Sequence, residues 1–219
     1  MRRVKQLPSR RKRALRRVLI AAAAVFLVNR IFLIGLLFPI QAIRHNEERL
    51  GTGRTAVVCR DWDPGFRWDY LSYLTESETV TMLSGARLGS YGWTDAFGVA
   101  VDCTEEAPLY GGWRNMSWTD GPSRFCVFGR VGDPDIVRLE IQLRYLDWKL
   151  ESRTALTWNS EREDWMEKDG RYYFLFQTHP PFNWADFHPG LNPLAVGLDE
   201  AGNEVVRIEL TQGASCHFS

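Results

Sequence analysis

The chain has 219 residues, and its 27 lysines and arginines equal its 27 aspartates and glutamates in number. The balance conceals an asymmetry, because the first 17 residues hold nine basic side chains and no acid. Beyond residue 41, 17 basic residues face 27 acids, which leaves that part at about −10. Nucleic-acid affinity comes largely from Lys and Arg that neutralise phosphates. The charge therefore argues against nucleic acid as a partner.

The first structural feature is an apolar stretch of 23 residues from Val18 to Ile40. A helix needs about 20 apolar residues to cross the hydrocarbon core of a bilayer. Basic residues beside a membrane segment stay on the cytoplasmic side and contact anionic lipid. We therefore predict a basic cytoplasmic tail over 1–17, a single-pass transmembrane anchor over 18–40 that binds membrane lipid, and an extracytoplasmic remainder.

Two details of this stretch leave an alternative open. Arg30 follows Asn29 in its middle, and a charge at that depth costs roughly 2.5 to 3.5 kcal/mol unless its side chain reaches the interface. The residues Val18 to Val28 alone resemble the apolar core of a signal peptide, with a poor cleavage site at Ile40-Gln41-Ala42. We favour an uncleaved anchor, and a cleaved signal peptide is the alternative.

Residues 41–54 are polar and contain two glycines, so we predict a linker there. Residues 55–219 suit one domain of short strands. Apolar residues alternate with polar ones over 137–143 and 206–210. A turn over 199–203 predicts a hairpin between strands at 194–198 and 204–210. Further strands are expected at 56–59, 78–83, 97–103, 125–131 and 171–177, and the pattern predicts an all-β, antiparallel sandwich or a closed barrel.

A family resemblance rests on turn and strand patterns between residues 124 and 210. These are the runs Phe128-Gly-Arg-Val131, Asp133-Pro-Asp-Ile136, Asp169-Gly-Arg171 and 196–204, the last reading VGLDEAGNE. They resemble β-sandwich modules of uncharacterised exported or membrane-anchored bacterial proteins. The resemblance implies an immunoglobulin-like β-sandwich and brings no catalytic residues.

The four cysteines all lie beyond the predicted anchor, and they are Cys59, Cys103, Cys126 and Cys216. An oxidising compartment permits disulfides, and an even number of cysteines is consistent with two bridges whose pairing the sequence does not choose. Buried free thiols are the alternative. Paired Cys/His spacing typical of zinc sites is missing from the sequence, so we predict neither a metal nor a cofactor.

Nine tryptophans are the remaining conspicuous feature. Five stand among glycines and polar residues typical of loops, where an exposed indole can stack on a sugar ring. These candidate ligand contacts are Trp62, Trp68, Trp93, Trp113 and Trp118. Burial of the rings in the core is the stronger interpretation of the group.

Candidate metal and catalytic groups are weaker. Asp61, Asp63 and Asp69 lack the complete calcium-loop pattern, and the cluster His179, Asp186 and His188 lies among prolines. The adjacent pair Cys216-His217 is poorly placed for a rigid dyad.

Nucleophile-elbow, phosphate-loop and metalloprotease motifs are missing from the sequence. We predict a non-catalytic, membrane-anchored interaction or scaffold module of the bacterial envelope that contacts another envelope protein. A glycan- or cell-wall-binding module is the alternative, and an envelope hydrolase is the second alternative.

Overall fold

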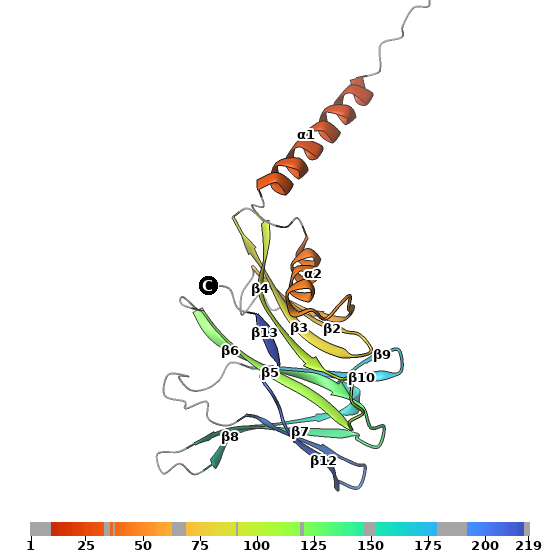
Figure 1. Cartoon of the computed structure of the whole chain (residues 1–219), viewed down its shortest axis with the longest axis vertical. Coiled ribbons are helices and arrows are strands. Elements are labelled where there is room, and N and C mark those ends of the chain that lie inside the picture. The colour runs from red at the N-terminus through yellow and green to blue at the C-terminus, as the bar shows by residue number, and fades with distance from the viewer. Residues whose placement is uncertain are drawn as a thin grey trace, which may run out of the picture.

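A computed structural model describes residues 10–32, 36, 38–62, 69–90, 92–118, 121–146, 152–178 and 192–216. Antiparallel β-sheet dominates it, which confirms the predicted strand content and strand direction. The strands form three sheets, and the helices α1 (Arg10–Phe32) and α2 (Pro39–Leu50) precede them (Figure 1).

The three sheets are called A, B and C, and the strands of each are given in the order in which they lie side by side. Sheet A contains β1 (Ala56–Asp61), β2 (Tyr70–Glu76), β3 (Val80–Gly89), β4 (Gly92–Asp102) and β13 (Ala214–Cys216). Sheet B contains β5 (Leu109–Trp118), β6 (Gly121–Val131), β10 (Arg171–Thr178) and β9 (Met166–Lys168). Sheet C contains β12 (Glu204–Glu209), β11 (Leu194–Leu198), β7 (Arg138–Leu146) and β8 (Ser152–Glu161), and a short 3₁₀ turn, η1 (Arg162–Asp164), follows β8.

Sheet B is the central layer, and both of its faces are buried. All residues of β6 from 124 to 131 are buried. Phe125 and Val127 belong to the core shared with sheet C, whereas Cys126 and Phe128 belong to the core shared with sheet A. Successive side chains of a strand point to opposite faces, so this strand needs apolar residues at consecutive positions. The sequence Phe125-Cys-Val-Phe128 meets that need.

Close packing inside sheet B depends on a glycine. A Cβ at Gly129 would lie 2.0 Å from the carbonyl oxygen of Tyr110 and 2.5 Å from Cζ of Phe174. Backbone and a packed ring occupy that space, so only glycine fits here.

The outer layers complete two cores. Between sheets B and C lie Leu139, Ile141 and Leu143 of β7, the alternating apolar residues from which this strand was predicted. Between sheets A and B lie Leu74, Leu83 and further residues of sheet A. The opposite face of sheet A is covered by α2 through the fully buried Ile43. The layers therefore run α2, sheet A, sheet B, sheet C (Figure 1).

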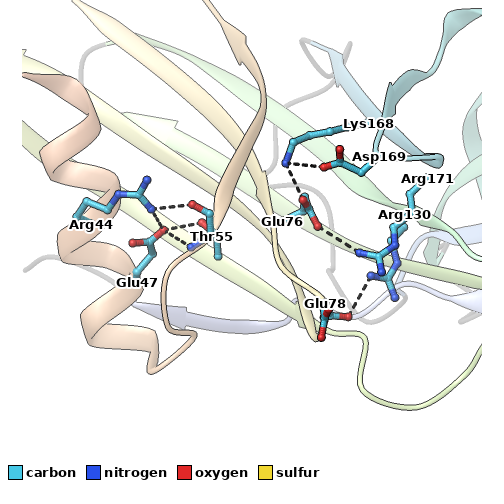
Figure 2. Close-up of polar contacts among 9 residues, drawn as sticks. All are labelled: Arg44, Glu47, Thr55, Glu76, Glu78, Arg130, Lys168, Asp169 and Arg171. Atoms are coloured by element: carbon cyan, nitrogen blue, oxygen red, sulfur yellow. Dashed lines mark hydrogen bonds and ion pairs between the residues drawn. The ribbon is translucent and has the colours of Figure 1, made fainter.

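Two buried polar residues hold α2 on sheet A. Asn46 is fully buried, and its Nδ2 donates to the carbonyl oxygen of Phe97 at 2.8 Å. The Oε1 atom of Glu47 accepts hydrogen bonds from the backbone N–H of Thr55 at 2.9 Å, from the hydroxyl of Thr55 at 2.5 Å and from Arg44 (Figure 2). These contacts fix the chain between α2 and β1. Residues 41–54, predicted as a linker, thus contain a docked helix instead.

The structure also corrects the prediction of a transmembrane helix over 18–40. Among the residues that the structure describes, no helix combines the length and the apolar character needed to cross a membrane. The helix α1 begins at Arg10 and includes the basic run, and its apolar part from Val18 ends at Phe32. That part is about 22 Å long at 1.5 Å per residue, against a hydrocarbon core of about 30 Å. A second helix begins at Pro39.

The contacts of Glu47 predict a large effect on stability. Glu47→Ala should lower the free energy of unfolding by about 2 kcal/mol, because the buried N–H of Thr55 loses its acceptor. Urea denaturation measures the change. Glu48→Ala is the matched control, since Glu48 is exposed on the same helix, and it should change stability by less than about 0.5 kcal/mol. Equal effects of the two substitutions would contradict the role assigned to Glu47.

Candidate functional site

The candidate tryptophans lie in different surroundings. Trp113 is 4% exposed, stacks on Phe125 in the core between sheets B and C, and donates from Nε1 to Oδ1 of Asn192 at 3.3 Å. Trp93 is half-buried beside the core under α2. Trp62 follows β1 and is 56% exposed. Trp68 and the side chain of Trp118 lie outside the described residues.

The cysteines correct the disulfide prediction. Cys59, Cys103 and Cys126 are free thiols, and two bridges would need all four cysteines, so the two-bridge prediction is wrong. The side chain of Cys216 lies outside the described residues. Burial raises the pKa of Cys126 to about 12 and that of Cys59 to about 11. Both thiols are therefore protonated at neutral pH and react poorly as nucleophiles.

The candidate metal and catalytic groups do not assemble among the described residues. Within them, no group of three His, Cys, Asp or Glu side chains is placed to hold a metal ion. Asp61 accepts a hydrogen bond from Gln177, and Asp69 pairs with Arg87. Asp63, His179, Asp186, His188 and His217 lie outside the described residues.

A polar cluster absent from the sequence predictions joins sheets A and B. Glu76, the last residue of β2, accepts a hydrogen bond from Nζ of Lys168 at 2.6 Å and lies 3.6 Å from Nη1 of Arg171 (Figure 2). Burial favours the neutral form of Glu76, but the two cations outweigh it and lower the pKa of this carboxyl. Burial and the Glu76 carboxylate raise the pKa of Tyr173 to about 12. The cluster binds the edge of sheet B to sheet A.

A pocket lies next to this cluster, where the start of β5, the end of β6 and the β9–β10 turn meet. Its volume is about 370 Å³, within the range of small-ligand sites. Two arginines, two tyrosines and two acids are among its lining residues, namely Arg130, Arg171, Tyr110, Tyr172, Glu106 and Asp133. The combination of rings and charges suits a small polar ligand.

Arg130 is the most constrained charge in this pocket. Its side chain projects from β6, and the residue is 8% exposed. Its guanidinium carbon lies 4.6 Å from the centroid of the Tyr110 ring, a cation–π distance. Nη1 donates to the carbonyl oxygen of Glu78 at 3.3 Å (Figure 2), and Nη2 donates to that of Cys103 at 3.5 Å. The sequence signal that could have identified Arg130 is its position as a charged residue within the apolar strand 125–131.

A second candidate surface is α1, which lies apart from the sheets (Figure 1). Its large apolar side chains with described positions are 50% to 64% exposed. They are Leu15, Val18, Leu19, Ile20, Val25, Phe26, Leu27 and Val28. The basic residues Arg11, Lys12, Arg16 and Arg17 precede or adjoin the apolar run and are exposed as well. This helix therefore combines an uncovered apolar surface with positive charge.

Comparison with known proteins adds no assignment to either surface: no family model, no curated protein and no solved structure matches the chain.

Proposed function

We propose that the chain is a non-catalytic, membrane-attached interaction module of the bacterial envelope, with its β domain outside the cytoplasm. The main support for the proposal is the exposure of the large apolar side chains of α1. Exposed apolar surfaces of this extent mark sites of contact with lipid or protein. Removing such side chains from water contributes roughly 25 cal/mol per Å² of apolar surface.

The charge of α1 favours lipid as the contact. Basic residues near an anionic bilayer contribute about 1 kcal/mol each, and membrane-bound helices combine such residues with apolar side chains. The four basic residues of α1 whose side chains are described are all exposed, and they stand at the start of its apolar run. We infer that the apolar side chains enter the bilayer while the basic ones stay among the headgroups.

The β domain supplies the interaction surface in this proposal. Its layers are held by apolar cores and by the Glu76 cluster, so it presents a preorganised surface that is suited to a protein partner. Among the described tryptophan side chains, Trp62 is exposed and favours the alternative, glycan binding, at one position. Within this part of the chain, one exposed indole provides less stacking than the row of rings expected of a carbohydrate site.

We also propose that the segment from β6 to β12 has an immunoglobulin-like fold. It is supported by the packing of two four-stranded antiparallel sheets, B and C, on a shared core. An experimental structure with another strand order in these sheets would contradict it.

Flotation with vesicles tests the lipid contact. The full chain should float with vesicles that contain anionic phosphatidylglycerol. Changing Arg11, Lys12, Arg16 and Arg17 to glutamine should weaken binding at least tenfold, because about 1 kcal/mol per charge is lost. The matched control changes Arg60, Arg138, Arg153 and Arg207 of the β domain to glutamine and should float like the parent. Absence of flotation, or equal loss in both variants, would refute the lipid contact.

Cross-linking tests the partner and the location together. A membrane-impermeant cross-linker applied to intact cells should join the β domain to one predominant neighbour, since the reagent reaches only groups outside the cytoplasm. The same reagent should give the same product in the glutamine variant of the β domain. Cross-linking that appears only after cell lysis would place the domain inside and overturn this part of the proposal.

A further inference from the structure

Arg130 forms no ion pair with an acid in the described part of the chain. Its described contacts are the two carbonyl oxygens and the Tyr110 ring, and no acid there lies within 4.0 Å of its nitrogens. The neighbouring cations Lys168 and Arg171, by contrast, both form ion pairs with Glu76. A buried charge is costly unless an opposite charge accompanies it. The Arg130 guanidinium is therefore suited to bind an anion.

The surroundings of Arg130 hold it in place. The hydroxyl of Tyr110 donates to the carbonyl oxygen of Glu105 at 2.6 Å and accepts from the N–H of Ala107 at 2.8 Å. This fixes the ring on which Arg130 stacks. The guanidinium has five N–H donors, and the two carbonyl contacts use one donor on each of Nη1 and Nη2. Donors therefore remain for a ligand in the pocket.

The acids of the pocket restrict the charge of that ligand. Glu106 and Asp133 line it beside Arg130 and Arg171, and Oδ1 of Asp133 accepts from the N–H of Asp135 at 2.9 Å. Repulsion from these acids disfavours a ligand with several negative charges. A carboxylate has one charge, and its two oxygens match the planar fork of a guanidinium.

We propose that this pocket binds a small molecule through a single carboxylate held by Arg130, with Arg171 as a second cation at its rim. The volume of about 370 Å³ admits a compact ligand, and Tyr110 and Tyr172 offer ring surfaces for its apolar part. This binding site goes beyond the proposed membrane attachment and does not depend on α1.

Titration of the full chain with benzoate, acetate and inorganic phosphate at constant ionic strength tests the site, with amide chemical shifts as the readout. Benzoate should shift the amides of Gly132, Gly170 and Tyr172 saturably, and phosphate should bind more weakly. Arg130→Gln should weaken benzoate binding at least tenfold. Arg138→Gln, a surface arginine paired with Glu161, is the matched control and should bind like the parent.

A second variant keeps the proposal testable if Arg130→Gln does not fold. Glu106 is exposed, so Glu106→Gln should fold normally, and loss of its repulsion should tighten benzoate binding severalfold. Shifts that do not saturate, tighter binding of phosphate than of benzoate, or unchanged affinity in both Arg130→Gln and Glu106→Gln would overturn the proposal.

Discussion

Sheet B is buried on both faces, and this burial determines how the other layers are arranged around it. Sheets A and C do not contact the same face of it, and each completes its own core against the alternate side chains of β6. Because both faces are apolar, sheet B is stable only when both neighbours are present. The stack is therefore expected to fold as one unit rather than as separate sheets.

This arrangement also determines where charge lies. Inside the stack, ionisable groups occur where sheets A and B meet, at both ends of the strands of sheet B. At one end Arg124 lies beside Asp61, and at the other Lys168 pairs with Glu76 while Arg130 faces a pocket. The exposed apolar run of α1 lies apart from these polar contacts. The two surfaces are independent in the structure and in their proposed roles.

Whether a strand or helix could be predicted from the sequence depends on which of its faces are buried. β7 and β12 were predicted correctly because alternation accompanies a half-buried strand, and the hairpin of β11 and β12 because its turn is explicit. β2 was missed because every residue from Tyr70 to Glu76 is buried and alternation disappears. The helix α2 was missed because its buried face includes Asn46 and Glu47. Neither the free thiols of Cys59, Cys103 and Cys126 nor the absence, among the described residues, of an ion pair at Arg130 is visible before strands distant in sequence are brought together.

Native-state hydrogen exchange measures whether the three sheets depend on one another for stability. Amides in β6 and β10, the two inner strands of sheet B, should exchange only through global unfolding, with a free energy equal to that from denaturant titration. Amides in the inner strands of sheets A and C should approach the same limit. Exchange of β6 at a much lower free energy, while β7 and β11 stayed protected, would contradict this interdependence, because sheet C would then be stable without sheet B.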